Sequence, residues 1–136
     1  LYEDVVAEVR NFLSARIAAC VAAGIERQRL LLDPGFGFGK TVAHNLQLLD
    51  RLPELALEGL PLLVGLSRKS LIGKVLAGNA QRGLPQGRLP QDRLAASLAL
   101  AVLAVERGAA IVRAHDVAAT VDALAMCAAM REWGRQ

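Results

Sequence analysis

The chain has 136 residues and a formal net charge of +3; 54% of its residues are hydrophobic and 21% are charged. This composition excludes an intrinsically disordered chain, because enough apolar surface is available to build a core. The 16 basic residues are spread among 13 acidic ones, and the longest apolar stretch, residues 94–105, is too short for a membrane span of roughly 20 residues. We therefore expect neither nucleic acid nor a membrane as a partner.

The first segment is predicted to be a helix followed by a strand. Apolar residues recur at intervals of three and four, as is typical of an amphipathic helix, and Gly24 is placed to end it. The three leucines at 30–32 are too short a run for a helix and predict a buried parallel strand. The apolar positions of the helix are Val5, Val6, Val9, Phe12, Leu13, Ile17 and Val21.

A second helix and a second strand follow. Residues 42–57 return to a helical pattern with a break expected near Pro53, and residues 61–66 predict a strand. The face of this helix that we expect to be apolar carries Leu46, Leu49 and Leu52.

The remainder of the chain continues the same alternation. A loop rich in glycine, proline and amides is expected on the surface. We predict a helix at 71–76, this loop at 78–91, a helix at 93–107 ended by Gly108, a strand at 109–112 and a helix at 117–133.

This order of elements predicts an α/β fold with a parallel sheet and right-handed crossovers. Three strands are too few for a complete α/β barrel, which typically needs about 250 residues. We therefore expect a partial domain over residues 1–136, corresponding to about the last three βα units of a (β/α)8 TIM barrel. The chain begins at Leu1, not at a methionine, and no secretion-type sequence precedes its first helix. These features lead us to expect a piece of a longer protein.

The two cysteines, Cys20 and Cys127, lie in helical patterns and lack metal-type spacing. We expect both to be reduced thiols in the core. Such cysteines fit a reducing, cytoplasmic location best.

Three polar motifs each follow a predicted strand directly. They are Asp-Pro-Gly-Phe-Gly-Phe-Gly-Lys at 33–40, Ser-Arg-Lys-Ser at 67–70 and Arg-Ala-His-Asp at 113–116. Because the carboxyl ends of parallel strands meet at one rim, groups far apart in the sequence can converge there on a ligand. The motifs therefore predict a small-molecule site at this rim.

The first motif does not fit a nucleotide-binding loop. Residues 39–41 match the end of a P-loop, but Pro34 stands where that motif needs a glycine, and the spacing also fails for a dinucleotide fingerprint. Asp33 instead offers a carboxylate that can accept two parallel hydrogen bonds from a guanidine-like ring edge. The alternative is a helix cap or turn aspartate.

The other two motifs carry polar residues two positions apart. An extended backbone would point Ser67 and Lys69 to one side and Arg68 away. A bare anion site or a solvated surface is the alternative here. Arg113 and His115 repeat the spacing and predict a clamp for an anion such as a phosphate.

Two further polar residues are expected to be structural. His44 lies within a helical pattern, and Asp116 precedes the apolar pattern of the last helix, where it is expected to be the N-cap.

Taken together, the three motifs resemble, in order and approximate spacing, the C-terminal half of the dihydropteroate synthase family. The resemblance implies a (β/α)8 barrel of the folate pathway that joins 4-aminobenzoate to 6-hydroxymethyl-7,8-dihydropterin pyrophosphate, giving dihydropteroate and pyrophosphate. It also implies a homodimer and a magnesium ion whose ligand lies in the N-terminal half, which this chain lacks. We therefore expect no metal ligand here and no activity from the chain alone.

The resemblance also assigns roles to individual residues. Asp33 would hold the amino-pyrimidine edge of the pterin, and Lys69 would bond to its ring. Arg113 would stack on the pterin and, with His115, bind the pyrophosphate, whose C–O bond breaks before the aromatic amine attacks. Lys69, Arg113 and His115 are thus the candidate catalytic residues. The candidate substrate-binding residues are Asp33, Gly37, Phe38, Gly65, Ser67, Lys69, Arg113 and His115, with Phe38 and Ser67 lining the aminobenzoate pocket.

Two other interpretations are open. A pterin-binding methyltransferase of related fold would share the acidic pterin contact but has no need of a pyrophosphate clamp, so Arg113 and His115 argue against it. A non-catalytic half-barrel that associates with a second copy through its open strand edges is the other alternative.

Overall fold

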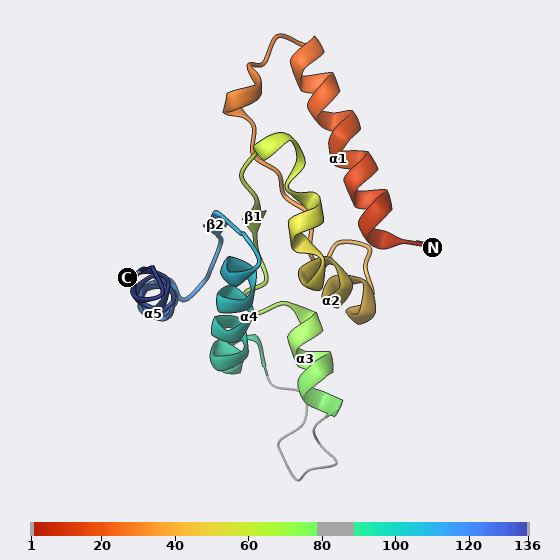
Figure 1. Cartoon of the computed structure of the whole chain (residues 1–136). Coiled ribbons are helices and arrows are strands. Elements are labelled where there is room, and N and C mark those ends of the chain that lie inside the picture. Colours follow the sequence, from red (N-terminus) through yellow and green to blue (C-terminus); the bar gives the residue numbers. More distant parts are fainter. Residues whose placement is uncertain (1, 79–88, 136) are drawn as a thin grey trace.

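The computed structural model describes residues 2–78 and 89–135 of the chain. Two short strands lie at the centre, with α1 and α5 on opposite sides of the molecule (Figure 1). The arrangement is α/β, as predicted. Most of the surface loop predicted at 78–91 lies outside the described residues.

Helix α1 (Val5–Ala22) begins where the Asp4 carboxylate accepts hydrogen bonds from the first backbone N–H groups of the helix. Gly24 follows its last turn with a φ of +90°, as expected for a residue that ends a helix. The apolar face is narrower than predicted, because Phe12 is 64% exposed and Val21 38%. This flank of the helix is therefore largely open to solvent.

Helix α2 (Val42–Asp50) starts with a capping box in which Thr41 and His44 exchange side-chain and backbone hydrogen bonds. The structural role predicted for His44 is therefore confirmed. The prediction for the face of this helix is partly wrong, because Leu46 is exposed and Leu48 is fully buried in its place.

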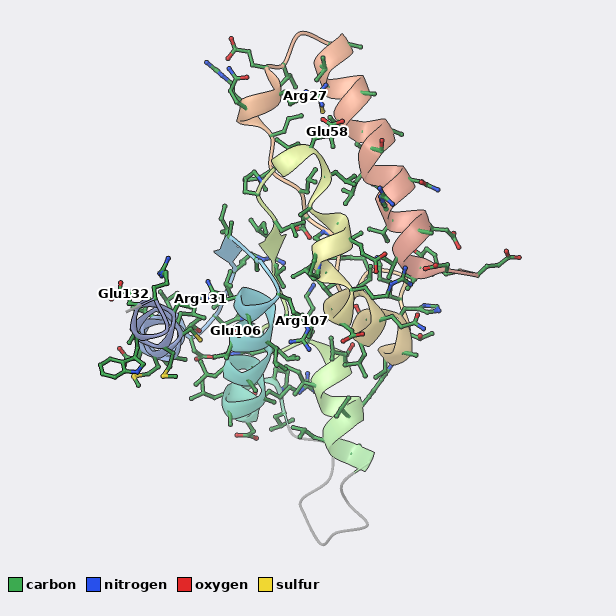
Figure 2. All side chains as sticks on the ribbon, in the orientation of Figure 1. Arg27, Glu58, Glu106, Arg107, Arg131 and Glu132 are labelled. Atoms are coloured by element: carbon green, nitrogen blue, oxygen red, sulfur yellow. The ribbon has the colours of Figure 1, made fainter. Side chains whose placement is uncertain are left out.

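The α-helical part ends at Asp50, earlier than predicted, and the chain continues as two 3-10 turns, η2 (Leu52–Leu55) and η3 (Leu57–Gly59). Pro53 lies in the first turn of η2, where its missing N–H costs little, whereas it would break a continuing α-helix. An ion pair between Arg27 of η1 (Arg27–Arg29) and Glu58 joins η3 to the segment that follows α1 (Figure 2).

The three segments predicted as strands run in parallel, but their regular pairing is shorter than predicted. Strand β1 (Leu63–Val64) pairs with β2 (Ile111–Val112), and Leu32 forms a single parallel bridge with Leu62. The N–H groups of both Ala110 and Ile111 donate to the Leu62 carbonyl, at 2.9 and 3.1 Å, so the ladder is irregular where β2 begins.

The remaining helices match their predicted extents closely. They are α3 (Ser70–Ala77), α4 (Leu94–Glu106), which a 3-10 turn, η5 (Pro90–Asp92), precedes, and α5 (Val117–Trp133). Gly108, with a φ of +101°, follows α4 as expected. Among the helices in the described part of the chain, none combines the length and apolar character needed to cross a membrane.

The main hydrophobic core joins α1, α2 and η2 to β1 and to the loop after Leu32. Of the described residues of α5, none belongs to this cluster; α5 packs mainly on α4. Cys127 is buried on α5, but Cys20 is only half-buried, so the prediction of a core position fails for Cys20; both thiols are free. The largest fully buried side chains are Phe36, Leu48, Leu52, Leu55, Leu62, Val5, Val6 and Val64.

Candidate functional site

A cavity of about 590 Å³ lies just beyond the carboxyl ends of β1 and β2. The motifs after these two strands line it, so polar residues that are almost 50 positions apart meet at one rim, as the sequence predicted. Five of the predicted site residues are among its lining residues, which are Gly65, Ser67, Arg68, Lys69, Pro90, Arg113, Ala114 and His115.

The guanidinium group of Arg113 lies against the backbone of Gly65. A Cβ atom added to Gly65 would lie only 3.0 Å from Arg113 Nε and 3.1 Å from Nη2. Gly65 therefore makes room for the arginine, and any side chain there would displace the guanidinium from the cavity wall.

Ser67 and His115 connect the loop after β1 to the loop after β2. The His115 N–H donates to Ser67 Oγ at 3.2 Å, and the imidazole Nδ1 lies 2.9 Å from the same oxygen. The hydroxyl thus fixes the imidazole at the edge of the cavity, where the ring remains exposed.

Lys69 extends from this cavity to the first motif. Its Nζ donates to the Phe36 carbonyl and lies 4.8 Å from the centre of the Phe38 ring. Gly37 has a φ of +83°, and a Cβ there would lie 3.0 Å from Lys69 Cδ, so the glycine allows the lysine to pass. Burial, followed by repulsion from Arg113, lowers the pKa of Lys69 below its usual value.

Asp33 lines a different cavity, of about 360 Å³, together with Lys40 and residues of α1. The structure therefore does not bring Asp33 into the cavity of the other two motifs. Its Oδ1 accepts a hydrogen bond from the Gly35 N–H at 2.9 Å, so the turn interpretation is correct for one oxygen. Within residues 2–78 and 89–135 we find no hydrogen bond to Oδ2, which leaves this oxygen available to a ligand.

Two residues bind the backbone of the first motif: Asn45 of α2, which the sequence did not mark, and Lys40, the last residue of the motif. Asn45, only 3% exposed, accepts from the Gly37 N–H at 2.8 Å and donates to the Thr41 carbonyl at 2.7 Å. Lys40 Nζ donates to the carbonyls of Gly35 and Phe38, at 2.9 and 3.1 Å. Desolvation lowers the pKa of Lys40.

Phe36 and Phe38 of this motif have opposite environments. Phe36 is 1% exposed and belongs to the core, whereas Phe38 is 70% exposed beside Lys69. The motif is therefore anchored by one ring and offers the other to a ligand.

Asp116 precedes α5, as predicted, but it does not cap the helix with its side chain. Its carboxylate instead accepts two hydrogen bonds from Arg68, at 2.8 Å from Nη2 and 3.2 Å from Nε. These bonds lower the pKa of Asp116. Asp116 is therefore the N-cap residue by position, as predicted, but its side chain pairs with Arg68 and makes no capping hydrogen bond.

The described residues offer no metal centre. Among residues 2–78 and 89–135, no three side chains of His, Cys, Asp or Glu are placed to hold an ion together. These described residues therefore do not fit the magnesium ion that the family resemblance implies.

The known proteins to which this chain is similar in sequence agree with one another. Residues 1–115 match the family model described as pterin binding enzyme. The dihydropteroate synthases of Neisseria meningitidis serogroup C and Escherichia coli (strain K12) are 52% and 49% identical to the chain over 124 and 123 residues. Each alignment covers 90% of this chain but only 41% and 40% of the relative.

Solved structures of dihydropteroate synthases are also similar to this chain. The Burkholderia cenocepacia dihydropteroate synthase complexed with 7,8-dihydropteroate has a TM-score of 0.90 at 49% identity, covering 100% of this chain and 48% of its own. The Xanthomonas albilineans enzyme with 4-aminobenzoic acid has a TM-score of 0.86 at 52% identity, covering 96% of this chain and 45% of its own. The chain thus spans less than half the length of these relatives.

Proposed function

The chain belongs to the pterin binding enzyme family, and we propose that it is the C-terminal part of a dihydropteroate synthase. In this proposal residues 1–136 supply the last three βα units of a (β/α)8 barrel, and a preceding segment supplies the rest. The proposal is supported by the family match and by the high structural similarity to relatives of which this chain covers less than half.

We propose that the substrates are 4-aminobenzoate and 6-hydroxymethyl-7,8-dihydropterin pyrophosphate, which the enzyme joins in folate biosynthesis. The single observation that carries this proposal is the meeting of Lys69, Arg113 and His115 on one cavity, with Lys69 within electrostatic range of Asp33. The Arg113 guanidinium and the His115 imidazole suit the pyrophosphate, Lys69 can donate to the pterin ring, and the free carboxylate oxygen of Asp33 suits the amino-pyrimidine edge. The related Burkholderia cenocepacia enzyme was solved in complex with 7,8-dihydropteroate, and the Xanthomonas albilineans enzyme with 4-aminobenzoic acid.

In the proposed mechanism, the residues of this chain stabilise charge, and the reaction uses no nucleophilic side chain. Arg113 and His115 hold the pyrophosphate, and negative charge develops there as the C–O bond breaks. The amine of 4-aminobenzoate attacks the pterin cation that remains, and the nitrogen of the new C–N bond becomes neutral when it releases one proton. Lys69 donates to the pterin ring, and Phe38 and Ser67 line the aminobenzoate pocket.

Several parts of the proposed enzyme lie outside this chain. We propose that magnesium, which would neutralise pyrophosphate charge, is held by residues of the preceding segment. The intact enzyme would be a cytoplasmic homodimer, and the isolated chain would be inactive because it holds only part of the pocket.

The proposal can be tested in the full-length protein with the variant His115→Ala. We expect the wild type to form dihydropteroate from labelled 4-aminobenzoate. By calorimetry, the variant should lose about tenfold in affinity for the pterin pyrophosphate, as for the loss of a charge-assisted hydrogen bond, and much less for the free pterin alcohol. His44→Ala alters the chain's other histidine, which caps α2 and packs edge-on against Tyr2, and should leave the ratio of the two affinities unchanged. Equal losses for both ligands would contradict the pyrophosphate role, and no product from the wild type would contradict the synthase.

A further inference from the structure

Arg68 has a backbone conformation that arginine rarely adopts. Its φ is +57°, in the left-handed region where the Cβ atom crowds the following carbonyl. Because it lies between Ser67 and Lys69, this conformation breaks the extended alternation expected from the sequence. The directions in which these two neighbours leave the chain therefore depend on Arg68.

Polar side chains from α4 and its N-cap hold this conformation. The Arg68 N–H donates to Ser97 Oγ at 3.0 Å, and the Arg68 carbonyl accepts from Arg93 Nη1 at 2.8 Å. Ser97 is only 7% exposed and lies in α4. Both backbone polar groups of Arg68 are thus bound by residues more than 20 positions away.

The position of Arg93 depends in turn on a glycine in α3. A Cβ atom added to Gly73 would lie 2.6 Å from Arg93 Nη2 and 3.1 Å from its Cζ. Glycine within a helix is destabilising relative to alanine. Here the glycine leaves the space that the guanidinium needs to reach the Arg68 carbonyl.

The side chain of Arg68 contacts the loop after β2, which carries Arg113 and His115. It forms a two-pronged pair with Asp116, the residue that directly follows His115. A bidentate pair fixes orientation as well as distance. The loop that carries Lys69 and the loop that carries Arg113 are therefore joined at a defined spacing, although the two cations repel each other.

On the basis of the proposed function, we propose that Arg68 is a positioning residue, which sets Lys69 against Arg113 at the spacing that the pterin pyrophosphate requires. Groups that are held in place before the ligand arrives need no reorganisation when charge develops. Ser97 and Asp116 act through Arg68 and touch no substrate themselves.

The first test is a matched pair at Ser97 in the full-length protein. Ser97→Thr and Ser97→Val add side chains of nearly equal shape, but only threonine keeps a hydroxyl for the Arg68 N–H. We expect kcat/KM for the pterin pyrophosphate to fall about tenfold in the valine variant relative to the threonine variant. Equal values in the two variants would overturn the proposal, because shared packing effects cancel between them.

The second test removes one partner of the Arg68 pair. Asp116→Asn should raise KM for the pterin pyrophosphate about tenfold while changing KM for 4-aminobenzoate far less. Glu54→Gln is the control, because Glu54 forms a similar two-pronged pair with Arg51, at 2.7 and 2.8 Å, away from both rim loops. An unchanged KM in Asp116→Asn, or the same change in both variants, would overturn the proposal.

Calorimetric binding of inorganic pyrophosphate separates this inference from the proposed function. Pyrophosphate binding that weakens about tenfold in Asp116→Asn supports the positioning role even where the wild type forms no dihydropteroate. A wild type that forms dihydropteroate, with pyrophosphate binding unchanged in Asp116→Asn, overturns the positioning role and leaves the synthase proposal intact.

Discussion

Helices α1 and α5 have nearly equal lengths, 18 and 17 residues, but they are packed very differently. Helix α1 buries five aliphatic side chains in the main core, whereas the buried residues of α5 are only Thr120 and Cys127. Five large apolar side chains of α5 are each more than half exposed: Val117, Val121, Met126, Met130 and Trp133. Helix α1 is therefore held mainly by buried apolar side chains, whereas α5 leaves most of its large apolar side chains exposed.

This difference continues into the site. The motif at 33–40 rests on the body of the molecule, because Phe36 is part of the core and Asn45 of α2 binds its backbone. The motif at 113–116 leads into α5 and is joined to the rest of the rim by polar contacts, mainly those of Ser67 and Arg68. The pterin side of the proposed pocket is thus set by apolar packing, and the pyrophosphate side by hydrogen bonds and charge.

The largest expected effect separates the two helices directly. Leu13→Ala in α1 removes a side chain that is 6% exposed and should lower the free energy of unfolding by about 2–4 kcal/mol. Met126→Ala in α5 removes a side chain that is 67% exposed and should change it by less than about 0.5 kcal/mol. Urea unfolding of this chain, followed by circular dichroism, measures both values. Equal losses would show that the exposed face of α5 is covered in solution.

The next effect concerns the side of the pocket that rests on the core. Asp33→Asn in the full-length protein should weaken pterin binding by roughly 2–3 kcal/mol, because a charge-assisted pair of hydrogen bonds is lost. Binding of inorganic pyrophosphate should stay within experimental error. Calorimetry with each ligand checks this separation. A pterin affinity equal to that of the wild type would mean that Asp33 serves only the turn with Gly35.

The same contrast explains how much of the fold could be predicted. The limits of α1, α4 and α5 follow from periodicity and from glycines such as Gly24 and Gly108, which are local signals. The predicted strands are longer than the observed ones, because the length of a ladder depends on where the neighbouring strand pairs. The Leu62 carbonyl, which accepts hydrogen bonds from two residues of the neighbouring segment, marks the point where the regular ladder stops. The exposure of Phe12 could not be predicted either, since periodicity gives a face but not what covers it.

For the site, the sequence predicted the residues of the three motifs but not the residues that hold them. Asn45 and Ser97 lie within helical patterns and bind backbone groups 8 and 29 positions away, so no local signal marks them. The positive φ of Arg68 is equally hidden, because glycine is the residue that usually signals it. Asp116 was predicted as an N-cap from its position alone, but its carboxylate pairs with the guanidinium of Arg68, 48 positions away, and does not cap the helix.

A smaller effect is expected where the two rim loops meet. The lowered pKa of Lys69 means that its charged form is less favourable in the folded protein than in the unfolded chain. This penalty is complete at a pH below the folded pKa and disappears as the pH rises above the unfolded value. Lys69→Met should therefore raise stability near neutral pH, with a gain over the wild type that shrinks toward pH values of about 10. Melting temperatures across this range measure the gain, and a gain that grows with pH would contradict the assignment.

The smallest effect concerns the ion pair between Glu106 of α4 and Arg131 of α5. Arg131 lies between these helices (Figure 2), with Nε 3.8 Å from a Glu106 carboxylate oxygen and Nη2 donating to the Val105 carbonyl. Both side chains of the ion pair are about half exposed, so water screens their attraction. Glu106→Gln should therefore cost less than about 0.5 kcal/mol in urea unfolding. A larger loss would mean that charge holds α5 to the molecule more strongly than the exposure of the two side chains indicates. The pair of Glu106 and Arg131 would then be a second polar anchor of α5, in addition to the pair of Arg68 and Asp116.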